Sequence, residues 1–490
     1  ATTSSPIVVN AGGTLASNAT FNTLVDPTLN GGTMTLNGGA SANYPAFAIK
    51  GTLTVGGSSA SAINVGTGSN NLINIGPSGT AGTLTVHVAD ATSSPAADLT
   101  INAVLQNNWN TAGTARIAST LSKTGAGTLT LSAANTYSGG TSVSQGTLTV
   151  ATGGTLGAVT GTLAVSNSNT GEGTDTVLNL SAAADTTTGS LSGTIAVPSS
   201  GVNTATINTQ AGRTFTVNQT AAGSFAGGIA GSGDFVLGAS STNTLTLTGA
   251  NTYTGTTTVA AGTLALVGGS QASPITVSSG ASLSFAIGSP TTSSSSFNVT
   301  AGTIKVTGTP TLDSHTLIAS STGITGTPTL DAPISGYLLK KYDDNSLRLI
   351  SLYQDWADTN DATGGPAADT DGDGYSNLME YAFGTDPAVN SPGSIAIDAG
   401  VVTATGQPIL VEENGVYYAV FGRRTDHVAA GLTYTVQFTA GLDQWTDSVT
   451  VPTVIATDGT IDAVRVPFPN FVASPSGPKK PYFFRVEIEK

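Results

Sequence analysis

Small hydrophobic and small polar residues alternate through much of residues 1–350. The pattern is clearest at 128–131 (TLTL) and 147–150 (TLTV). A period of two places one set of side chains on a buried face and the other towards solvent, as in a half-buried β-strand. Segments rich in glycine and asparagine separate these runs, and both residues tolerate the positive φ of a tight corner. The pattern therefore predicts short strands joined by corners.

The same region contains an internal repeat. Residues 123–150 (KTGAGTLTLSAANTYSGGTSVSQGTLTV) return as residues 243–266 (NTLTLTGANTYTGTTTVAAGTLAL), with leucines, an Asn-Thr-Tyr triplet and a later glycine at matching places. One such unit cannot bury its apolar face alone, so copies have to stack. We therefore predict an all-β chain in which residues 1–350 form a β-solenoid with degenerate strand repeats.

These residues resemble the autotransporter-associated β-strand repeat, found in passenger domains of secreted bacterial surface proteins. The resemblance lies in the K-T-G-x-G-T-L-T-L, N-T-Y-x-G and G-T-L-x-V/L parts of the two copies. It implies a right-handed parallel β-helix on or outside the cell surface. It names no ligand, because members of the family include adhesins, enzymes and stalks.

Composition agrees with an exported protein. The 490 residues include no cysteine, and 29 acidic against 15 basic residues give a net charge of −14. This acidic balance argues against a nucleic-acid partner. No apolar run of about 18 residues is present, so we expect no membrane-spanning segment. The chain opens at Ala1 with neither methionine nor an apolar segment, and we expect the mature form of a secreted protein whose signal peptide has been removed.

Charge marks a boundary near residue 340. Only 9 of the 29 acidic residues lie in residues 1–339. Just beyond, a hairpin around residues 343–345 is predicted to cap the last coil. Residues 351–390 are predicted to be a junction that holds a calcium loop and a short helix. Residues 391–490 contain about seven alternating segments, which predict a small antiparallel β-sandwich.

The junction contains a metal-binding pattern. Residues 369–380 (DTDGDGYSNLME) fit D-x-D-x-D-G-x5-E, whose oxygen atoms suit Ca²⁺. The predicted ligands are the carboxylates of Asp369, Asp371 and Asp373, the Tyr375 backbone carbonyl, Asn377 directly or through water, and a bidentate Glu380. Gly374 is predicted to make the sharp turn, and residues 377–383 a helix that ends at Gly384.

This segment resembles EF-hand-like and dockerin-type calcium loops, and also thrombospondin type 3 repeats. An EF-hand has a helix directly before its loop, whereas residues 362–368 contain Gly-Gly-Pro and are not predicted to form one. Dockerins carry two loops, and this chain carries one. We therefore predict a structural Ca²⁺ clamp, with a solvated acidic linker as the alternative.

Parallel β-helices also include polysaccharide-degrading enzymes, which need paired carboxylates or a base with cationic partners. Acidic residues before 340 are scattered, and the closest pair, Glu172 and Asp175, lies in a loop rich in glycine and threonine. The run 313–315 (DSH) has the residue types of a catalytic triad, but a strand would turn its serine to the opposite face. Trp109 and the pair Tyr137 and Tyr253 either contact sugars or pack in corners, and we favour packing. We predict no enzymatic activity.

These observations predict a secreted structural protein, a calcium-stabilised subunit of an extracellular filament or surface fibre that self-associates head to tail. The end strands of a solenoid expose unpaired backbone N–H and C=O groups, which a cap or another strand has to pair. The segment Pro6, Ile7, Val8 and Val9 is predicted to add a strand to the C-terminal domain of the next copy. The alternative is an adhesin or glycan-binding stalk whose partner is a cell-surface glycan or matrix. A polysaccharide-degrading β-helix enzyme is the third possibility.

Overall fold

The computed structural model describes residues 7–490 except 294, 300, 391–392, 473–476 and 478. It contains many short strands and two short helices, which confirms the all-β prediction. Neither described helix is long and apolar enough to cross a membrane. The chain divides into two compact units. We call residues 1–309, 316–331 and 341–347 the solenoid unit, and residues 310–315, 332–340 and 348–490 the C-terminal unit.

Three sheets form the first part of the solenoid unit. The first contains β1 (Val8–Asn10), β4 (Thr28–Asn30), β7 (Thr52–Gly56), β10 (Gly82–Val88), β14 (Ser119–Thr124), β16 (Gly140–Val143), β18 (Leu163–Val165) and β21 (Leu191–Ser192). The second contains β2 (Thr14–Ala16), β5 (Thr33–Leu36), β8 (Ser61–Val65), β11 (Leu99–Ile101), β15 (Thr128–Leu131), β17 (Gly146–Val150), β19 (Asp175–Asn179), β22 (Thr204–Thr209) and β25 (Gly228–Gly231). The third contains β3 (Asn22–Val25), β6 (Phe47–Lys50), β9 (Leu72–Ile75), β12 (Val104–Trp109) and β13 (Arg116–Ile117).

Three further sheets continue the stack. The fourth contains β20 (Thr186–Thr188), β23 (Thr214–Val217), β26 (Asp234–Leu237), β28 (Thr257–Val259), β31 (Ile275–Val277), β34 (Phe297–Asn298) and β37 (Ile324–Thr325). The fifth contains β24 (Gly223–Phe225), β27 (Thr244–Leu247), β29 (Thr263–Leu266), β32 (Ser282–Ala286), β35 (Thr303–Thr307) and β38 (Thr329–Leu330). The sixth contains β30 (Ser270–Gln271), β33 (Thr291–Ser293), β36 (Ser314–Ser320), β40 (Ser346–Ser351) and β39 (Tyr337–Lys341), the last two forming the predicted hairpin around residues 343–345.

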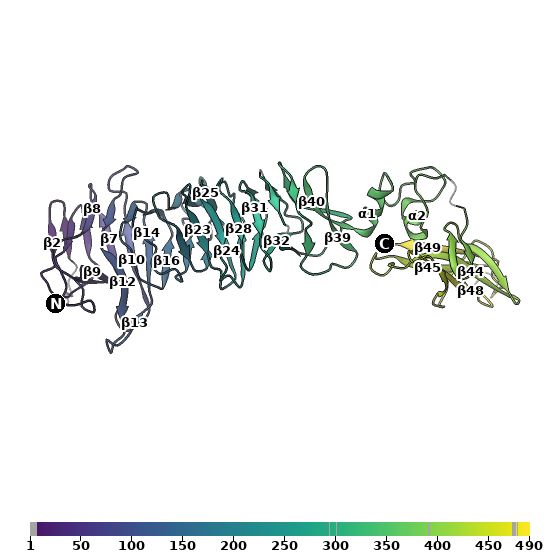
Figure 1. Ribbon diagram of the computed structural model, residues 1–490, viewed down its shortest axis with the longest axis horizontal. Coiled ribbons are helices and arrows are strands. Elements are labelled where there is room, and N and C mark those ends of the chain that lie inside the picture. The colour runs from purple at the N-terminus through teal and green to yellow at the C-terminus, as the bar shows by residue number, and fades with distance from the viewer. Residues whose placement is uncertain (1–6, 294, 300, 391–392, 473–476, 478) are drawn as a thin grey trace. The chain divides into compact units, whose positions relative to one another are not determined.

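Parallel pairing of successive coils makes this unit a β-solenoid, as predicted. Strands that neighbour each other in a sheet come from consecutive turns of the chain, and Figure 1 shows them following one another in a row. In the second sheet, Leu129 lies between Leu99 of the preceding coil and Leu148 of the following one. All three leucines are fully buried. Burial of each such side chain contributes about 1.5–3 kcal/mol, so the leucine ladder drives the stacking.

The Asn-Thr-Tyr triplet of the repeat joins neighbouring coils at a corner. The Asn135 side chain accepts a hydrogen bond from the Leu105 amide (2.9 Å) and donates one to the Thr155 carbonyl (2.8 Å). The Tyr137 hydroxyl lies 2.7 Å from the Thr141 hydroxyl, and the ring is fully buried. In the second copy, Tyr253 is equally buried and contacts Thr257 in the same way. Both tyrosines therefore pack in corners, as predicted, and are not available to a sugar.

A glycine is required where the repeat turns into its last strand. Gly146 has a φ of +66°, and a Cβ atom there would lie 2.5 Å from the Gly125 carbonyl oxygen. Gly262 of the second copy has a φ of +71°. Any other residue would add both left-handed strain and a clash with the neighbouring coil.

Lys123 is fully buried at an inward position of β14, where the alternation of Leu121 continues. Its ammonium group donates to three backbone carbonyls, those of Thr124 (3.0 Å), Gly125 (2.7 Å) and Gln145 (3.0 Å). Burial lowers the pKa of Lys123 to about 7, and the negative charge of Asp98 acts in the opposite direction. Lys123 thus binds two coils together through their carbonyl groups.

The C-terminal unit contains short antiparallel sheets in the part of the chain for which the sequence predicts a small sandwich. Its strands are β41 (Ala396–Asp398) and β42 (Val401–Ala404), then the sheet of β43 (Ile409–Glu413), β44 (Val416–Arg424), β48 (Ile461–Pro467) and β47 (Thr453–Thr457), and the sheet of β46 (Thr446–Asp447), β45 (Thr433–Thr439) and β49 (Phe483–Glu489). Phe421 of β44 and Phe438 of β45 lie in one hydrophobic cluster, so the two larger sheets share a core. Phe383 of the helix α2 (Asn377–Phe383) completes that cluster.

One helix was not predicted. The helix α1 (Leu352–Thr359) begins directly after β40, and the Ser351 side chain accepts a hydrogen bond from the Gln354 amide as its N-cap. Its Tyr353 ring packs edge to face on Tyr381 of α2, with ring centroids 5.5 Å apart. The segment predicted to bind calcium therefore belongs to the C-terminal unit, beside two helices that pack on each other.

The buried lysine predicts a pH dependence of solenoid stability. Unfolded Lys123 binds its proton up to pH about 10.5, whereas the folded chain releases it near 7. Between these values the unfolded state binds more protons, so the free energy of unfolding rises with pH. The Lys123→Met variant lacks this titrating group, so its free energy of unfolding lacks the pH-dependent contribution of Lys123. Urea unfolding of both proteins at several pH values between 7 and 10, followed by circular dichroism, is expected to show wild-type stability rising relative to the variant. Parallel curves would contradict the assignment.

Candidate metal centre

The helix α2 begins and ends as the sequence predicts. The Ser376 side chain accepts a hydrogen bond from the Met379 amide as N-cap, and Gly384 ends the helix in the left-handed conformation at a φ of +77°. The helix places Glu380 on the side of the loop and Phe383 in the core of the sandwich. Its ends are thus fixed by local sequence, and its direction by packing.

Three aspartates converge in the loop before this helix. Asp369, Asp371 and Asp373 offer carboxylate oxygens that all lie within 4.8 Å of one another. The Asp369 carboxylate accepts hydrogen bonds from the amides of Gly374 (2.9 Å) and Gly372 (2.7 Å), and these bonds lower the pKa of Asp369. Gly374 has a φ of +94°, which confirms the predicted sharp turn.

Glu380 is the most unusual group of the site. It is fully buried, and neither carboxylate oxygen has a hydrogen-bond partner among the described residues. One oxygen of Asp371 and one of Asp373 are also buried and unpartnered within the described part of the chain. The pKa of Glu380 is raised to about 7, first by burial and then by the negative charges of Asp371, Asp373, Asp369 and Asp386 in that order.

Unpaired buried carboxylate oxygens are costly, and a hard divalent cation is the partner that relieves them. The four carboxylates of Asp369, Asp371, Asp373 and Glu380 supply the oxygen donors that such an ion prefers. The residues present therefore fit Ca²⁺. The structure brings the three aspartates together, and it places Glu380 where their charges act on its pKa.

Two further predicted ligands have other contacts. The Tyr375 amide donates to Asp373 (2.8 Å), and its ring packs on Phe383. Asn377 is fully buried and donates to the carbonyls of Thr363 (2.8 Å) and Gly365 (3.0 Å). The Asn377 side-chain oxygen accepts from the Thr370 hydroxyl (2.8 Å). Asn377 therefore holds the incoming segment 363–370 against α2, and ligation by Tyr375 and Asn377 stays a prediction.

Sequence reasoning missed residues that shape this site. The carboxylate of Asp386, two positions beyond the helix end, helps to raise the pKa of Glu380. The Thr370 hydroxyl also contacts the Thr363 backbone, which closes the segment before the loop. Asp386 carried a signal, since it is an acidic residue two positions after the C-cap glycine Gly384. Thr370 carried none, because it occupies a variable position of the motif.

The residues predicted for assembly lie in the first coil of the solenoid unit. Val8 and Val9 belong to β1, which pairs in parallel with β4 in the register Val8 to Thr28. Val9 is buried, whereas Val8 is 53% exposed and Ile7 is half-buried. Pro6 lies outside the described residues. The segment is thus part of the solenoid, with β1 as the first strand of its sheet.

The run with triad residue types has other contacts. The His315 ring nitrogen Nε2 accepts hydrogen bonds from the amides of Thr311 (3.2 Å) and Leu312 (3.1 Å). Asp313 accepts from the Ser351 hydroxyl (2.6 Å) and forms an ion pair with Lys490. Both side chains are therefore engaged in local structure.

Comparison with known proteins adds one finding. Residues 121–150 and 237–266 match the family model of the passenger-associated-transport-repeat. The two repeat copies are therefore similar to passenger repeats. They overlap the segments 123–150 and 243–266 found in the sequence, and a repeat of this kind suggests a secreted surface protein. No curated protein and no solved structure matches the chain.

The position of Asn377 predicts a strong effect of its removal. The Asn377→Ala variant loses the three side-chain hydrogen bonds that hold segment 363–370 against α2, so we expect the C-terminal unit to lose about 1–3 kcal/mol. The matched control is Asn390→Ala, because Asn390 is exposed and makes one bond, to the Asp371 carbonyl. Hydrogen exchange at the amides of Asn377 and Leu378, which donate to Ala368 and Pro366, reports the loss. Equal exchange in both variants would contradict the role of Asn377.

Proposed function

We propose that the chain is a secreted structural protein of the cell surface, a subunit of an extracellular fibre that calcium stabilises and that grows by head-to-tail self-association. The observation that carries the proposal is the ladder of parallel strands in the solenoid unit, whose sheets begin with the open strands β1 and β2. Each coil pairs with the coil before it through parallel strands. The same kind of pairing between copies would continue the unit into a fibre. We propose no catalytic role for it.

The scattered acidic residues of the solenoid unit support a structural role. Asp175 accepts a hydrogen bond from the Thr204 hydroxyl (2.6 Å) of the next coil. Asp234 likewise accepts from the Thr256 amide and hydroxyl (2.7 and 2.8 Å). These carboxylates join coils, as the asparagines do.

Calcium would act on the core of the C-terminal unit. The helix α2 carries Glu380 beside the loop, Phe383 in the sandwich core, and Tyr381 in the cluster with α1. A cation held by Glu380 and the three aspartates would neutralise buried charge and fix this helix. Binding to the folded state alone adds stability according to the ratio of free ion to dissociation constant.

We expect calcium to raise the unfolding temperature of the C-terminal unit. At a concentration 100 times the dissociation constant, the ion adds about 2.7 kcal/mol, or on the order of 5–10 °C. The Glu380→Gln variant should bind Ca²⁺ at least ten-fold more weakly, while its calcium-free form is more stable because it buries no charge. Calorimetric titration and thermal melts with calcium or chelator measure both effects.

The control for this experiment is Asp398→Asn, which removes an exposed carboxylate of β41. It is expected to bind Ca²⁺ like the wild type. A wild-type chain that shows neither a binding heat nor a chelator effect would overturn the calcium proposal and favour the solvated acidic linker.

Exposed apolar groups favour contact between unlike ends. Val8 projects from the open strand β1 of the solenoid unit. In the C-terminal unit, Leu410, Tyr417 and Tyr482 are about half exposed or more and line a hollow of about 590 Å³ beside the end strand β43. Addition of one strand edge to another supplies backbone hydrogen bonds, and the hollow supplies apolar contact. We therefore propose that β1 of one copy meets β43 of the next.

We expect charged substitutions at either contact to stop fibre growth. Val8→Lys and Leu410→Lys each place an ammonium group in the apolar contact, and Val202→Lys is the control at a loop position that is 76% exposed. Electron microscopy and sedimentation of wild type and control should show fibres, and each variant alone should stay monomeric.

Mixing the two variants sharpens this experiment. Val8→Lys retains an intact C-terminal surface and Leu410→Lys an intact β1, so a mixture should form dimers and no longer species. Fibres from either variant alone, or a wild type that never assembles, would refute the proposed contact.

A further inference from the structure

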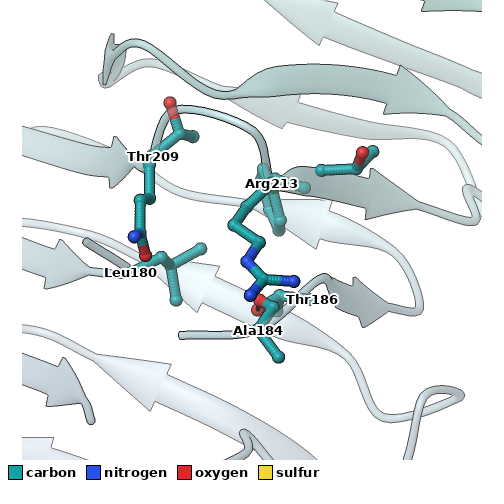
Figure 2. A pocket seen from close by; sticks show the side chains of 8 residues that line it. Leu180, Ala184, Thr186, Thr209 and Arg213 are labelled. Atoms are coloured by element: carbon teal, nitrogen blue, oxygen red, sulfur yellow. Dashed lines mark hydrogen bonds between the residues drawn. The ribbon is translucent and has the colours of Figure 1, made fainter. Parts of the chain in front are cut away.

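One hollow between coils is too small to hold a ligand. Figure 2 shows it, with the Arg213 side chain extending towards Ala184 and Thr186. Its volume of about 10 Å³ has room for about one water molecule. A larger hollow lies beside β12, where the chain leaves the regular coil.

A hairpin interrupts the solenoid at this point. β12 pairs in parallel with β9, but its end turns back and pairs antiparallel with β13, Trp109 facing Arg116. In Figure 1 this hairpin projects from the row of strands at the label β13. Its turn is closed by hydrogen bonds between Asn110 and Thr114. The hairpin therefore forms one wall of a hollow that the repeat itself does not provide.

The hollow has a volume of about 240 Å³, and none of its lining residues is charged. Aromatic rings of Phe21, Tyr44 and Trp109 line it together with several amide and hydroxyl side chains, Asn43, Asn74, Ser78, Asn108, Asn110 and Thr111. Sites that enclose a drug-sized ligand measure about 300–1,000 Å³. This hollow therefore suits a single ring of a larger molecule.

Neighbouring side chains hold the aromatic walls in place. The Arg116 guanidinium lies over the Trp109 ring, 4.7 Å from its centroid. Arg116 itself is tied to the carbonyls of Asn107 (2.6 Å) and Ala42 (2.9 Å). Tyr44 packs edge to face on Phe21 with centroids 5.5 Å apart, yet remains 56% exposed. The rings are thus pre-positioned and accessible.

Two hydrogen-bond donors at the hollow have no acceptor in the described part of the chain. Asn74 lies on the outer face of β9, since its neighbours Ile73 and Ile75 fill the core, but it is only 1% exposed. The Asn74 side-chain oxygen accepts from Gln106 (2.8 Å) and Arg116 (3.3 Å), which fixes the orientation of the amide. Its Nδ2 group and the Trp109 Nε1 group are both buried without a partner among the described residues.

From these contacts we propose that the hollow binds a neutral sugar residue of a glycan. The C–H face of a sugar packs on aromatic rings such as Trp109 and Tyr44. Sugar hydroxyls accept hydrogen bonds from N–H groups, which would satisfy the buried donors of Asn74 and Trp109. The surrounding amides and hydroxyls both donate and accept, as a ring with several hydroxyls requires.

Other ligand classes fit less well. A nucleotide would bring phosphates to a chain of net charge −14, and the two cations at the walls of the hollow, Arg116 and Lys50, are hydrogen-bonded to the lining residues Asn74 and Ser78. Hydrolysis of the sugar would need two carboxylates beside the bond, and no lining residue carries one. The site therefore binds and does not cleave. It depends neither on calcium nor on fibre formation, so chelator and the Val8→Lys variant should leave it intact.

The full chain should be tested on an array of neutral, uronate-containing and sialylated oligosaccharides, and then by titration with the neutral glycans that bind. Trp109→Ala is expected to weaken binding at least ten-fold. Trp109→Phe keeps a ring but lacks the N–H group, so its affinity for the glycan should lie between those of the wild type and Trp109→Ala. Tyr44→Ala tests the opposite wall without touching the hairpin and should also weaken binding.

The matched control is Trp445→Ala, because Trp445 of the C-terminal unit also lies under an arginine, Arg485, at 4.5 Å. It should bind like the wild type. Three results would overturn the proposal: no neutral glycan bound by the wild type, binding of acidic glycans alone, or affinity unchanged in both Trp109→Ala and Tyr44→Ala. Circular dichroism of each variant separates lost binding from lost folding.

Discussion

Each strand of the solenoid unit depends on the strands of the coils before and after it. Leu129 is buried because Leu99 and Leu148 lie on either side in the same row. A slip of one residue would turn every such side chain outwards, so the register of the whole stack is fixed by the alternation. The corners follow the same constraint, since Asn135 satisfies backbone groups of two other coils at once. Order in one coil is therefore a condition for order in the next.

The C-terminal unit obeys a different constraint, the cost of buried charge. Its second helix contributes Phe383 to the sandwich core and Tyr381 to the cluster with α1, so the helix cannot move away from the loop. That packing buries Glu380 beside three aspartates. Hydrophobic burial thus keeps Glu380 near the aspartates against the repulsion between their charges.

Sequence alone predicted the parts of the structure that local rules decide. Period-two alternation located strands such as β15 and β17, and cap residues located α2 and its end at Gly384. The calcium motif located the three aspartates that converge. These local rules failed for residues whose contacts lie far away in the sequence. Lys123 occupies an inward position that a charged residue normally avoids, because carbonyl groups of a second coil receive it.

The helix α1 and the role of Asn377 were missed for related reasons. The residues of α1 follow β40 directly, and their start signal, the N-cap Ser351, is itself the last residue of the strand, so the sequence pattern did not separate helix from strand. Asn377 sits at a ligand position of the motif, yet the path of segment 363–370 engages its amide. Motif spacing gives the order of residues, but the course of the incoming chain decides where a side chain points.

Binding chemistry in this chain is therefore expected where the repeat is broken. A regular coil uses its backbone groups for the ladder, its inward side chains for the core, and its corner groups for neighbouring coils. Tyr137 and Tyr253 illustrate this, because the repeat buries both rings completely. Trp109 is an aromatic residue of the same unit that lines a hollow. It does so because the end of β12 leaves the parallel ladder and forms a hairpin with β13. The repeat supplies rigidity, and the insertion supplies a surface that the next coil does not cover.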